Sequence, residues 1–370
     1  MKIVILQGAF FPVPPVLGGA VEKMWFALGK HFASRGHRVV HISKQYEDYP
    51  TEEWIDGVLH LRIKGYDMPS SVLYLKWLDL RYSLRAKSVI PKDADVIITN
   101  TFWAPLILSR HFKKRCFVDV QRMPKGQMKL YKRVSRLRAN SRSVADAIRK
   151  ELNGYSKQKI VFIPNPLPFE DKPEVNFDEK KPIILYVGRL HPEKGVDLLI
   201  KAFRQVKTDW TLKIIGPYKT ATGGGGTEYF EYLKKLAEGA DVQFSGPVFD
   251  AKRLGANYAE ASVFVYPSIA EKGETFGLAP LEAMAWGCVP VVSSLGCFRD
   301  FIEPGNNGLL FNHRSKDAVK ELKSALQLLI SDADLRSQLS RVALLVQQTH
   351  SPGFIASHFL EEFEKMIFEE

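Results

Sequence analysis

Two glutamates flank the expected start of a helix in the segment EKGETFGLAPLEAMAWGCVPVV, residues 271–292. Near Gly277 the backbone can approach a ligand closely, and the first N–H groups of the helix point outward. Such a helix start carries roughly half a positive charge and binds phosphate well. Glu282, one turn into the helix, suits the two hydroxyls of a ribose, and Glu274 suits a sugar hydroxyl. The segment therefore predicts a phosphate site with contacts from Thr275, Phe276, Gly277 and Leu278.

Two cations are expected at the end of another strand, in the segment YVGRLHPEKGVDLLIKAF, residues 186–203. Arg189 and Lys194 follow the strand that ends at Val187 and precede the next helix. Fixed cations beside a diphosphate neutralise the charge that develops as a nucleotide leaves, a task that magnesium performs in many enzymes. Because no His or Cys cluster in the sequence has the spacing of metal ligands, we expect neither a metal nor a cofactor.

A glycine pair opens a further expected helix, in the sequence LGGAVEK at residues 17–23. Gly18 and Gly19 would offer backbone N–H groups to a phosphate at the helix start. By itself such a pair is also typical of an ordinary turn. The spacing differs from G-x-G-x-x-G and so disfavours a dinucleotide site.

Apolar β-branched runs alternate with helical patterns along the chain, which predicts parallel sheets flanked by helices, with ligands at the carboxyl ends of the strands. A segment rich in Pro, Asp and Glu at 164–181 indicates a linker. We expect one domain at 1–168, joined by a C-terminal helix at 353–370, and a second at 169–352. The predicted strands are 2–7, 38–43, 58–63, 95–100, 116–120, 160–163, 182–187, 211–215, 242–245, 262–266, 289–293 and 308–311, and the predicted helices include 20–34, 143–152, 196–206, 229–238, 278–286 and 316–330.

The segment from Glu274 to Glu282, with FGLAPLEA between and after, resembles the signature of the retaining glycosyltransferases of family four. The resemblance implies the GT-B fold, an α/β architecture of two Rossmann-like parallel-sheet domains facing across a cleft. It also implies that Glu274 binds hydroxyls of the donor sugar, that Glu282 binds the ribose, and that Arg189 and Lys194 act on the departing diphosphate. The glycine-rich loop at Gly18 and the sequence IPNP at 163–166 match the family as well.

Two further segments bear on this resemblance. The sequence FSGPVFD at 244–250 is similar to the segment where the family packs the nucleotide base, with the backbone near Pro247 and Val248 reading its edge. After the strand at 95–100, many members have a histidine, whereas this chain has Asn100. An asparagine cannot act as a general base. The resemblance implies an attack on the face of the leaving group, in which a phosphate oxygen takes the acceptor's proton and no side-chain base is required.

Positive charge is concentrated in one zone. Residues 110–150 hold fourteen Lys or Arg against two Asp, a net charge of +12, so that the rest of the +11 chain sums to −1. This zone is either a solvated surface or a dock for an anionic membrane or a lipid-linked pyrophosphate acceptor. Arg122 and Lys125, just after a strand, would meet acceptor phosphates. A helix predicted at 128–138 would carry Lys129, Lys132, Arg133 and Arg136 on one face.

The compartment follows from composition. Cys116, Cys288 and Cys297 form no recognisable disulfide framework, and no run of about 18 uncharged apolar residues could span a bilayer. The apolar run at the N-terminus has the length of a strand rather than of a secretory signal. We therefore predict a cytoplasmic protein, with peripheral contact to the inner face of the cytoplasmic membrane through the basic zone.

The resulting hypothesis is a metal-independent retaining transferase. It would move a hexose, glucose being favoured, from a UDP-sugar such as UDP-glucose to a glycan or lipid-linked acceptor in bacterial surface polysaccharide synthesis. The alternatives are a nucleotide-sugar epimerase or hydrolase on the same scaffold and a non-catalytic homologue. A nucleic-acid-binding protein, suggested by an isoelectric point near 9.3, is disfavoured because no aromatic residues are interleaved as stacking platforms.

Overall fold

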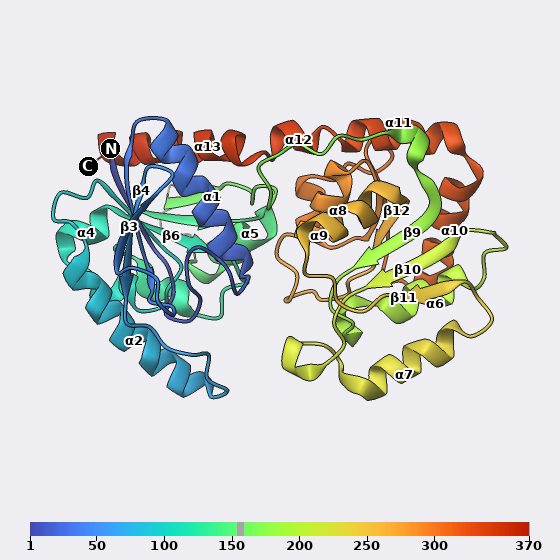
Figure 1. Cartoon of the computed structure of the whole chain (residues 1–370), viewed down its shortest axis with the longest axis horizontal. Coiled ribbons are helices and arrows are strands. Elements are labelled where there is room, and N and C mark those ends of the chain that lie inside the picture. The colour runs from blue at the N-terminus through green and yellow to red at the C-terminus, as the bar shows by residue number, and fades with distance from the viewer. Residues whose placement is uncertain (154–158, 370) are drawn as a thin grey trace. The chain divides into compact units, whose positions relative to one another are not determined.

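The computed structural model describes residues 1–153 and 159–369, which form two compact units (Figure 1). Unit 1 comprises Met1–Glu170 and His350–Glu370, and unit 2 comprises Asp171–Thr349. Each unit is built around a sheet of its own. Glu370, the last residue of the predicted C-terminal helix, lies outside the described residues.

In the described part of unit 1, eight strands form a sheet with the order β3-β4-β2-β1-β5-β6-β7-β8. Neighbouring strands are parallel, except that β3 pairs with β4 in the antiparallel sense. The central strands consist mostly of buried apolar residues because helices cover both faces of the sheet. The strands are β1 (Lys2–Leu6), β2 (Arg38–Lys44), β3 (Glu52–Ile55), β4 (Val58–Ile63), β5 (Val96–Thr99), β6 (Cys116–Val120), β7 (Arg136–Ala139) and β8 (Ile160–Phe162).

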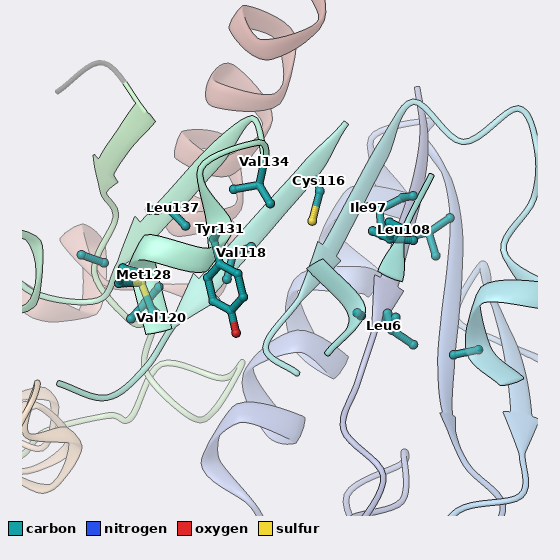
Figure 2. Packing of buried hydrophobic residues seen from close by; sticks show 14 of the residues in the cluster. Leu6, Ile97, Leu108, Cys116, Val118, Val120, Met128, Tyr131, Val134 and Leu137 are labelled. Carbon is teal, nitrogen blue, oxygen red and sulfur yellow. The ribbon is translucent and has the colours of Figure 1, made fainter. Parts of the chain in front are cut away.

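Two sets of helices cover the two faces of this sheet. On one face, α1 (Ala20–Ser34) packs on α13 (Pro352–Phe368), where the rings of Trp25 and Phe359 meet edge to face at 5.0 Å. Figure 2 shows the apolar cluster on the other face, to which Tyr82, Ala104 and Ile148 contribute from three different helices. Those helices are α2 (Val72–Val89), α3 (Ala104–Ile107) and α5 (Arg142–Glu151), and the short α4 (Arg110–Lys114) lies between α3 and β6 in sequence.

In the described part of unit 2, six parallel strands have the order β11-β10-β9-β12-β13-β14. They are β9 (Lys181–Val187), β10 (Thr211–Ile215), β11 (Val242–Phe244), β12 (Ala261–Tyr266), β13 (Val289–Ser293) and β14 (Leu309–Phe311). The helices are α6 (Val196–Phe203), α7 (Gly226–Ala237), α8 (Ala251–Glu260), α9 (Leu278–Ala285), α10 (Ala318–Ser331), α11 (Ala333–Ala343) and α12 (Val346–Thr349).

All strands predicted from the sequence are confirmed, but the helix predicted at 128–138 is wrong. Gln127–Tyr131 is a short 3₁₀ helix, and Arg136–Ala139 is strand β7. Arginine can lie within this sheet because each guanidinium meets acidic partners. Arg136 pairs with Glu362 and Glu369 at 2.7 Å, and the fully buried Arg138 pairs with Asp119 at 2.7 Å. The continuous basic helix face therefore does not exist, and Arg136 faces α13 instead of solvent.

We expect Asp119→Ala to lower the free energy of unfolding by about 3–5 kcal/mol, because it leaves the buried charge of Arg138 without its carboxylate. Urea-induced unfolding monitored by tryptophan fluorescence measures this change. The exposed pair Arg149–Asp146 provides a control, since Asp146→Ala should cost less than about 1 kcal/mol. Equal small losses in both variants would contradict the assigned role of Asp119.

Candidate active site

Two of the predicted catalytic residues form an ion pair in unit 2. The Nζ atom of Lys194 lies 2.7 Å from Oε2 of Glu274, and the two side chains are only 8% and 11% exposed. Lys194 also lies over the ring of Tyr266, with Nζ 5.5 Å from the ring centroid. Lys194 follows β9 and Glu274 follows β12, which are neighbours in the sheet. The carboxyl ends of two adjacent parallel strands thus bring these residues together.

The loop that carries Lys194 is fixed by its neighbours. Lys194 ends a 3₁₀ helix, η4 (Pro192–Lys194), and Gly195 then takes a φ of 66°. A Cβ atom at Gly195 would lie 2.2 Å from the carbonyl oxygen of Pro267, so only glycine fits. The N–H of Ile269 donates to the carbonyl of Glu193 at 2.9 Å. These contacts hold the loop after β9 against the loop after β12 and position the ammonium group.

Helix α9 begins as the sequence predicts. Its N-cap residue, Gly277, has a φ of 93° and offers no side chain to cap the first turn. A Cβ atom at Gly277 would lie 2.4 Å from the ring of Phe298, so this position also requires glycine. Pro280 lies within the first turn, where a missing N–H has little cost. Gly277 therefore makes no side-chain hydrogen bond to the first turn of α9. Helix starts attract anions because their first N–H groups point outward.

Arg189 lies in the loop after β9, before η4. Its guanidinium contacts the Glu193 carboxylate at 3.0 Å and the Gly223 carbonyl at 2.5 Å. Burial, and after it the Glu274 carboxylate, raises the pKa of both Tyr186 and Tyr266, and the Arg189 charge acts on both in the opposite direction. The charge of Arg189 therefore acts on Tyr186 and Tyr266. Its guanidinium makes its hydrogen bonds with other residues, Glu193 and Gly223.

The remaining predicted donor contacts lie on α9 and on the loop after β11. Glu282 is half-buried, and its carboxylate adds to burial in raising the pKa of Tyr258 on α8. Pro247 is exposed and Val248 is half-buried, directly before the first turn of α8. Among the residues that the structure describes, no three His, Cys, Asp or Glu side chains are grouped to hold a metal ion.

In unit 1, the predicted residues follow three adjacent strands. Gly18 and Gly19 lie between β1 and α1, Asn100 directly follows β5, and Arg122 and Lys125 follow β6. The sheet order places β1, β5 and β6 side by side, so these residues lie at one edge of the sheet. Gly18 and Gly19 have φ values of 83° and 94°, which only glycine adopts readily.

Glu22 is an important residue that sequence reasoning missed. A Cβ atom at Gly19 would lie 2.2 Å from its Oε2 atom, so the carboxyl group sits directly at the start of α1. Burial raises the pKa of Glu22, and the positive charge of Arg122 opposes that change. The structure therefore brings Arg122 near the glycine pair. It also places the carboxyl group of Glu22 there. An anion at this helix start would be repelled by an ionised carboxylate and would bind more favourably beside a protonated one.

The loop after β5 is held by Asp79 of α2. Its Oδ2 atom accepts hydrogen bonds from the N–H groups of Phe102 at 3.2 Å and Trp103 at 3.3 Å. Burial raises the pKa of Asp79 to about 6. Just before this loop, Oδ1 of Asn100 is buried without a hydrogen-bond partner among the described residues. Lys125 is exposed, and its backbone N–H is bonded to Gln127.

Comparison with known proteins identifies the class to which the chain belongs. The family profile described as "Glycosyl transferases group 1" matches residues 169–344, and the profile described as "Glycosyltransferase Family 4" matches residues 18–171. The chain has 25% identity with the lipopolysaccharide 1,2-N-acetylglucosaminetransferase of Salmonella typhimurium, over 98% of both chains. It has 32% identity with the sulfoquinovosyl transferase SQD2 of Arabidopsis thaliana over 45% of its own length, but spans only 30% of that protein.

A solved structure shares the fold over almost the whole length. Anabaena HepE, determined in complex with UDP-glucose, matches with a TM-score of 0.72 at 18% identity, over 99% of this chain and 100% of that one. The two profiles together extend over both parallel-sheet units. The chain is therefore a glycosyltransferase with the GT-B fold, and the predicted fold class is confirmed.

We expect the Lys194–Glu274 contact to appear as strong energetic coupling. Lys194→Met and Glu274→Gln should each destabilise the protein, because each leaves a nearly buried group unpaired, and the double variant should recover at least about 1 kcal/mol of the summed loss. Denaturant unfolding of the four proteins gives the coupling. The more exposed pair Lys201–Asp197 on α6 is the control, with an expected coupling of about 0.3–0.5 kcal/mol. Additive losses at Lys194 and Glu274 would refute the pairing.

Asp79 predicts a pH dependence of stability. Its folded pKa of about 6 lies above the ordinary 3.8, so its stabilising contribution is complete below about pH 4 and is lost as the pH rises through 6. Between about pH 4 and 7 the protein should lose about 3 kcal/mol relative to Asp79→Asn. The variant keeps an oxygen for the two N–H groups. The free energy of unfolding of both proteins is measured across this pH range. Their difference removes the contribution of other groups that titrate there, such as His60, whose burial lowers its pKa to about 4. A constant difference would contradict the prediction.

Proposed function

We propose that this glycosyltransferase is a metal-independent, retaining enzyme of family four. It moves a hexose, with glucose favoured, from a UDP-sugar to a glycan or lipid-linked acceptor in polysaccharide synthesis. The observation that carries the proposal is the nearly buried Lys194–Glu274 pair next to the uncapped start of α9. The UDP-glucose complex of Anabaena HepE and the lipopolysaccharide substrate class of the Salmonella relative support the choice of donor and pathway.

The donor diphosphate contacts the N–H groups of residues 275–278 at the start of α9, beside the cations Arg189 and Lys194. Glu282 accepts hydrogen bonds from the ribose hydroxyls, and Glu274, oriented by Lys194, accepts one from the sugar. The base packs at Pro247 and Val248. A helix start and two cations together stabilise the charge that develops on the leaving UDP.

The transfer step needs no side-chain base in this scheme. The acceptor oxygen attacks the anomeric carbon on the face that the diphosphate leaves. The new carbon–oxygen bond forms as the bond between the anomeric carbon and the phosphate oxygen breaks. The electron pair of the broken bond departs with UDP. The acceptor's proton moves to the same phosphate oxygen. Asn100, which cannot take a proton, is therefore compatible with this reaction, and its unpartnered Oδ1 is available to accept a hydrogen bond from the acceptor.

The acceptor binds at the strand ends of unit 1, where Arg122 and Lys125 contact its phosphate groups if it is lipid-linked. The basic zone contributes an electrostatic attraction to an anionic membrane surface of about 1 kcal/mol per nearby cation. Lys129, Lys132 and Arg133 are exposed and can take this role, whereas Arg136 and Arg138 are engaged in buried ion pairs.

Nucleotide selectivity can be tested by thermal denaturation with UDP, GDP and ADP and their glucose conjugates. A ligand at about 100 times its dissociation constant should stabilise the protein by about 2.7 kcal/mol, and we expect this of the uridine series alone. Glu282→Ala should reduce the stabilisation by UDP-glucose, because the ribose loses its carboxylate partner. Equal shifts with all three bases, or an unchanged shift in Glu282→Ala, would overturn the assigned nucleotide site.

Turnover with UDP-glucose is expected to fall by about 100-fold or more in Arg189→Ala and in Lys194→Met, because each removes a charge that stabilises the transition state. Lys207→Ala, an exposed cation of unit 2 after α6, is the control and should keep full activity. Analysis of the products separates the alternatives. Release of free glucose or of an epimer as the main product would indicate a hydrolase or an epimerase, and strict dependence on magnesium would contradict the charge scheme.

A further inference from the structure

The outer face of α2 carries an apolar stripe that the described residues of unit 1 leave exposed. Leu73, Trp77, Leu80 and Leu84 recur at helical spacing on this face, and the first, second and fourth are exposed by 82%, 47% and 52%. The inner face, with Leu78, Tyr82 and Ala86, is buried against the sheet. The helix is therefore apolar on two opposite sides, of which only one is used for folding.

The exposed rings on this face have an ordered arrangement. Tyr74 and Trp77 stack with a centroid distance of 5.6 Å and an interplanar angle of 17°. The guanidinium of Arg81 lies over the ring of Trp77, 4.9 Å from the ring centroid. Aromatic residues with an apolar body and a polar edge, accompanied by arginine, are typical of the zone between lipid headgroups and acyl chains.

Cations border the stripe on both sides. At 3.6 residues per turn, Lys76 and Lys87 lie along one border of the stripe and Arg81 along the other, and all three are exposed. The single acidic residue of α2, Asp79, is buried and bonded to the loop after β5. A second copy of this chain docked symmetrically on the stripe would bring these cations together, whereas an anionic bilayer would attract them while burying the apolar side chains.

We propose that α2 lies in the interface of an anionic membrane, with Leu73, Trp77 and Leu84 inserted among the acyl chains. The helix does not span the bilayer, since no helix in the described parts of the chain is long and apolar enough to do so. Asp79 connects this surface to the loop that follows Asn100, so the docked helix would hold the acceptor end of unit 1 near the lipid headgroups. This last step rests on the proposed lipid-linked acceptor, but the membrane contact itself does not.

The test is flotation of the full chain with phosphatidylcholine vesicles and with vesicles that also contain phosphatidylglycerol. We expect binding to the anionic vesicles only. The variant Leu73→Gln/Trp77→Gln/Leu84→Gln should bind at least tenfold more weakly, and Lys76→Gln/Arg81→Gln/Lys87→Gln should lose the preference for phosphatidylglycerol. The matched control, Trp54→Gln/Phe368→Gln, replaces two large exposed side chains elsewhere on unit 1 and should bind normally. Unchanged binding of the stripe variant would overturn the proposal.

Insertion is tested separately with lipids brominated in the acyl chains, which quench nearby indoles. Quenching is expected in the natural protein and should be lost in Trp77→Phe, which retains an aromatic ring and should still bind. Binding without quenching would show a purely electrostatic contact and reject insertion. Self-association that the stripe variant abolishes, with no vesicle binding, would identify a second copy as the occupant. Stabilisation by UDP should persist in the stripe variant, so a missing UDP effect in the natural protein would count against the proposed function alone.

Discussion

The ion pair between Lys194 and Glu274 is the contact on which the candidate site depends. It joins loops that follow two adjacent strands, β9 and β12, and most of its surface is shielded from water. In such a place a single unpaired charge would be costly, so each residue constrains the position of the other. In the proposed donor complex, this pair would present a fixed carboxylate to the sugar and a fixed cation to the diphosphate.

Close backbone approach makes this contact possible. Gly195 and Gly277 both adopt positive φ values, and at each position a Cβ atom would collide with a neighbouring segment. The first glycine lets the loop after β9 pass against Pro267, and the second lets the start of α9 pass against Phe298. Any side chain at these two positions would collide with its neighbour, so the two segments could not approach as closely as they do. In the proposed donor complex, access of a diphosphate to the start of α9 depends on the absence of these side chains.

Sequence reasoning predicted strands β9 to β14 of unit 2, because strands buried on both faces are continuous apolar runs. It also placed Lys194 and Glu274 in segments that follow strands, and the structure pairs them there. It failed at residues 128–138, where basic residues at apparent helical spacing are divided among a 3₁₀ helix, a turn and strand β7. Arg138 is tolerated there only because Asp119, distant in sequence, supplies its counter-charge. Glu22 was missed for the same reason: its burial and its proximity to Arg122 depend on tertiary packing. Periodicity records local geometry and contains no information on such partners.

The exposed stripe of α2 illustrates another limit of pattern analysis. A helix that is apolar on two opposite sides lacks the contrast by which a surface helix is recognised, so its sequence resembles that of a core helix. Only the structure shows that one side is filled by the sheet and the other is not. Asp79 on the inner side accepts hydrogen bonds from the loop after β5, so the position of the residues beside Asn100 depends on that of α2. One helix thus carries both the exposed stripe and a contact to the strand ends where the proposed acceptor binds.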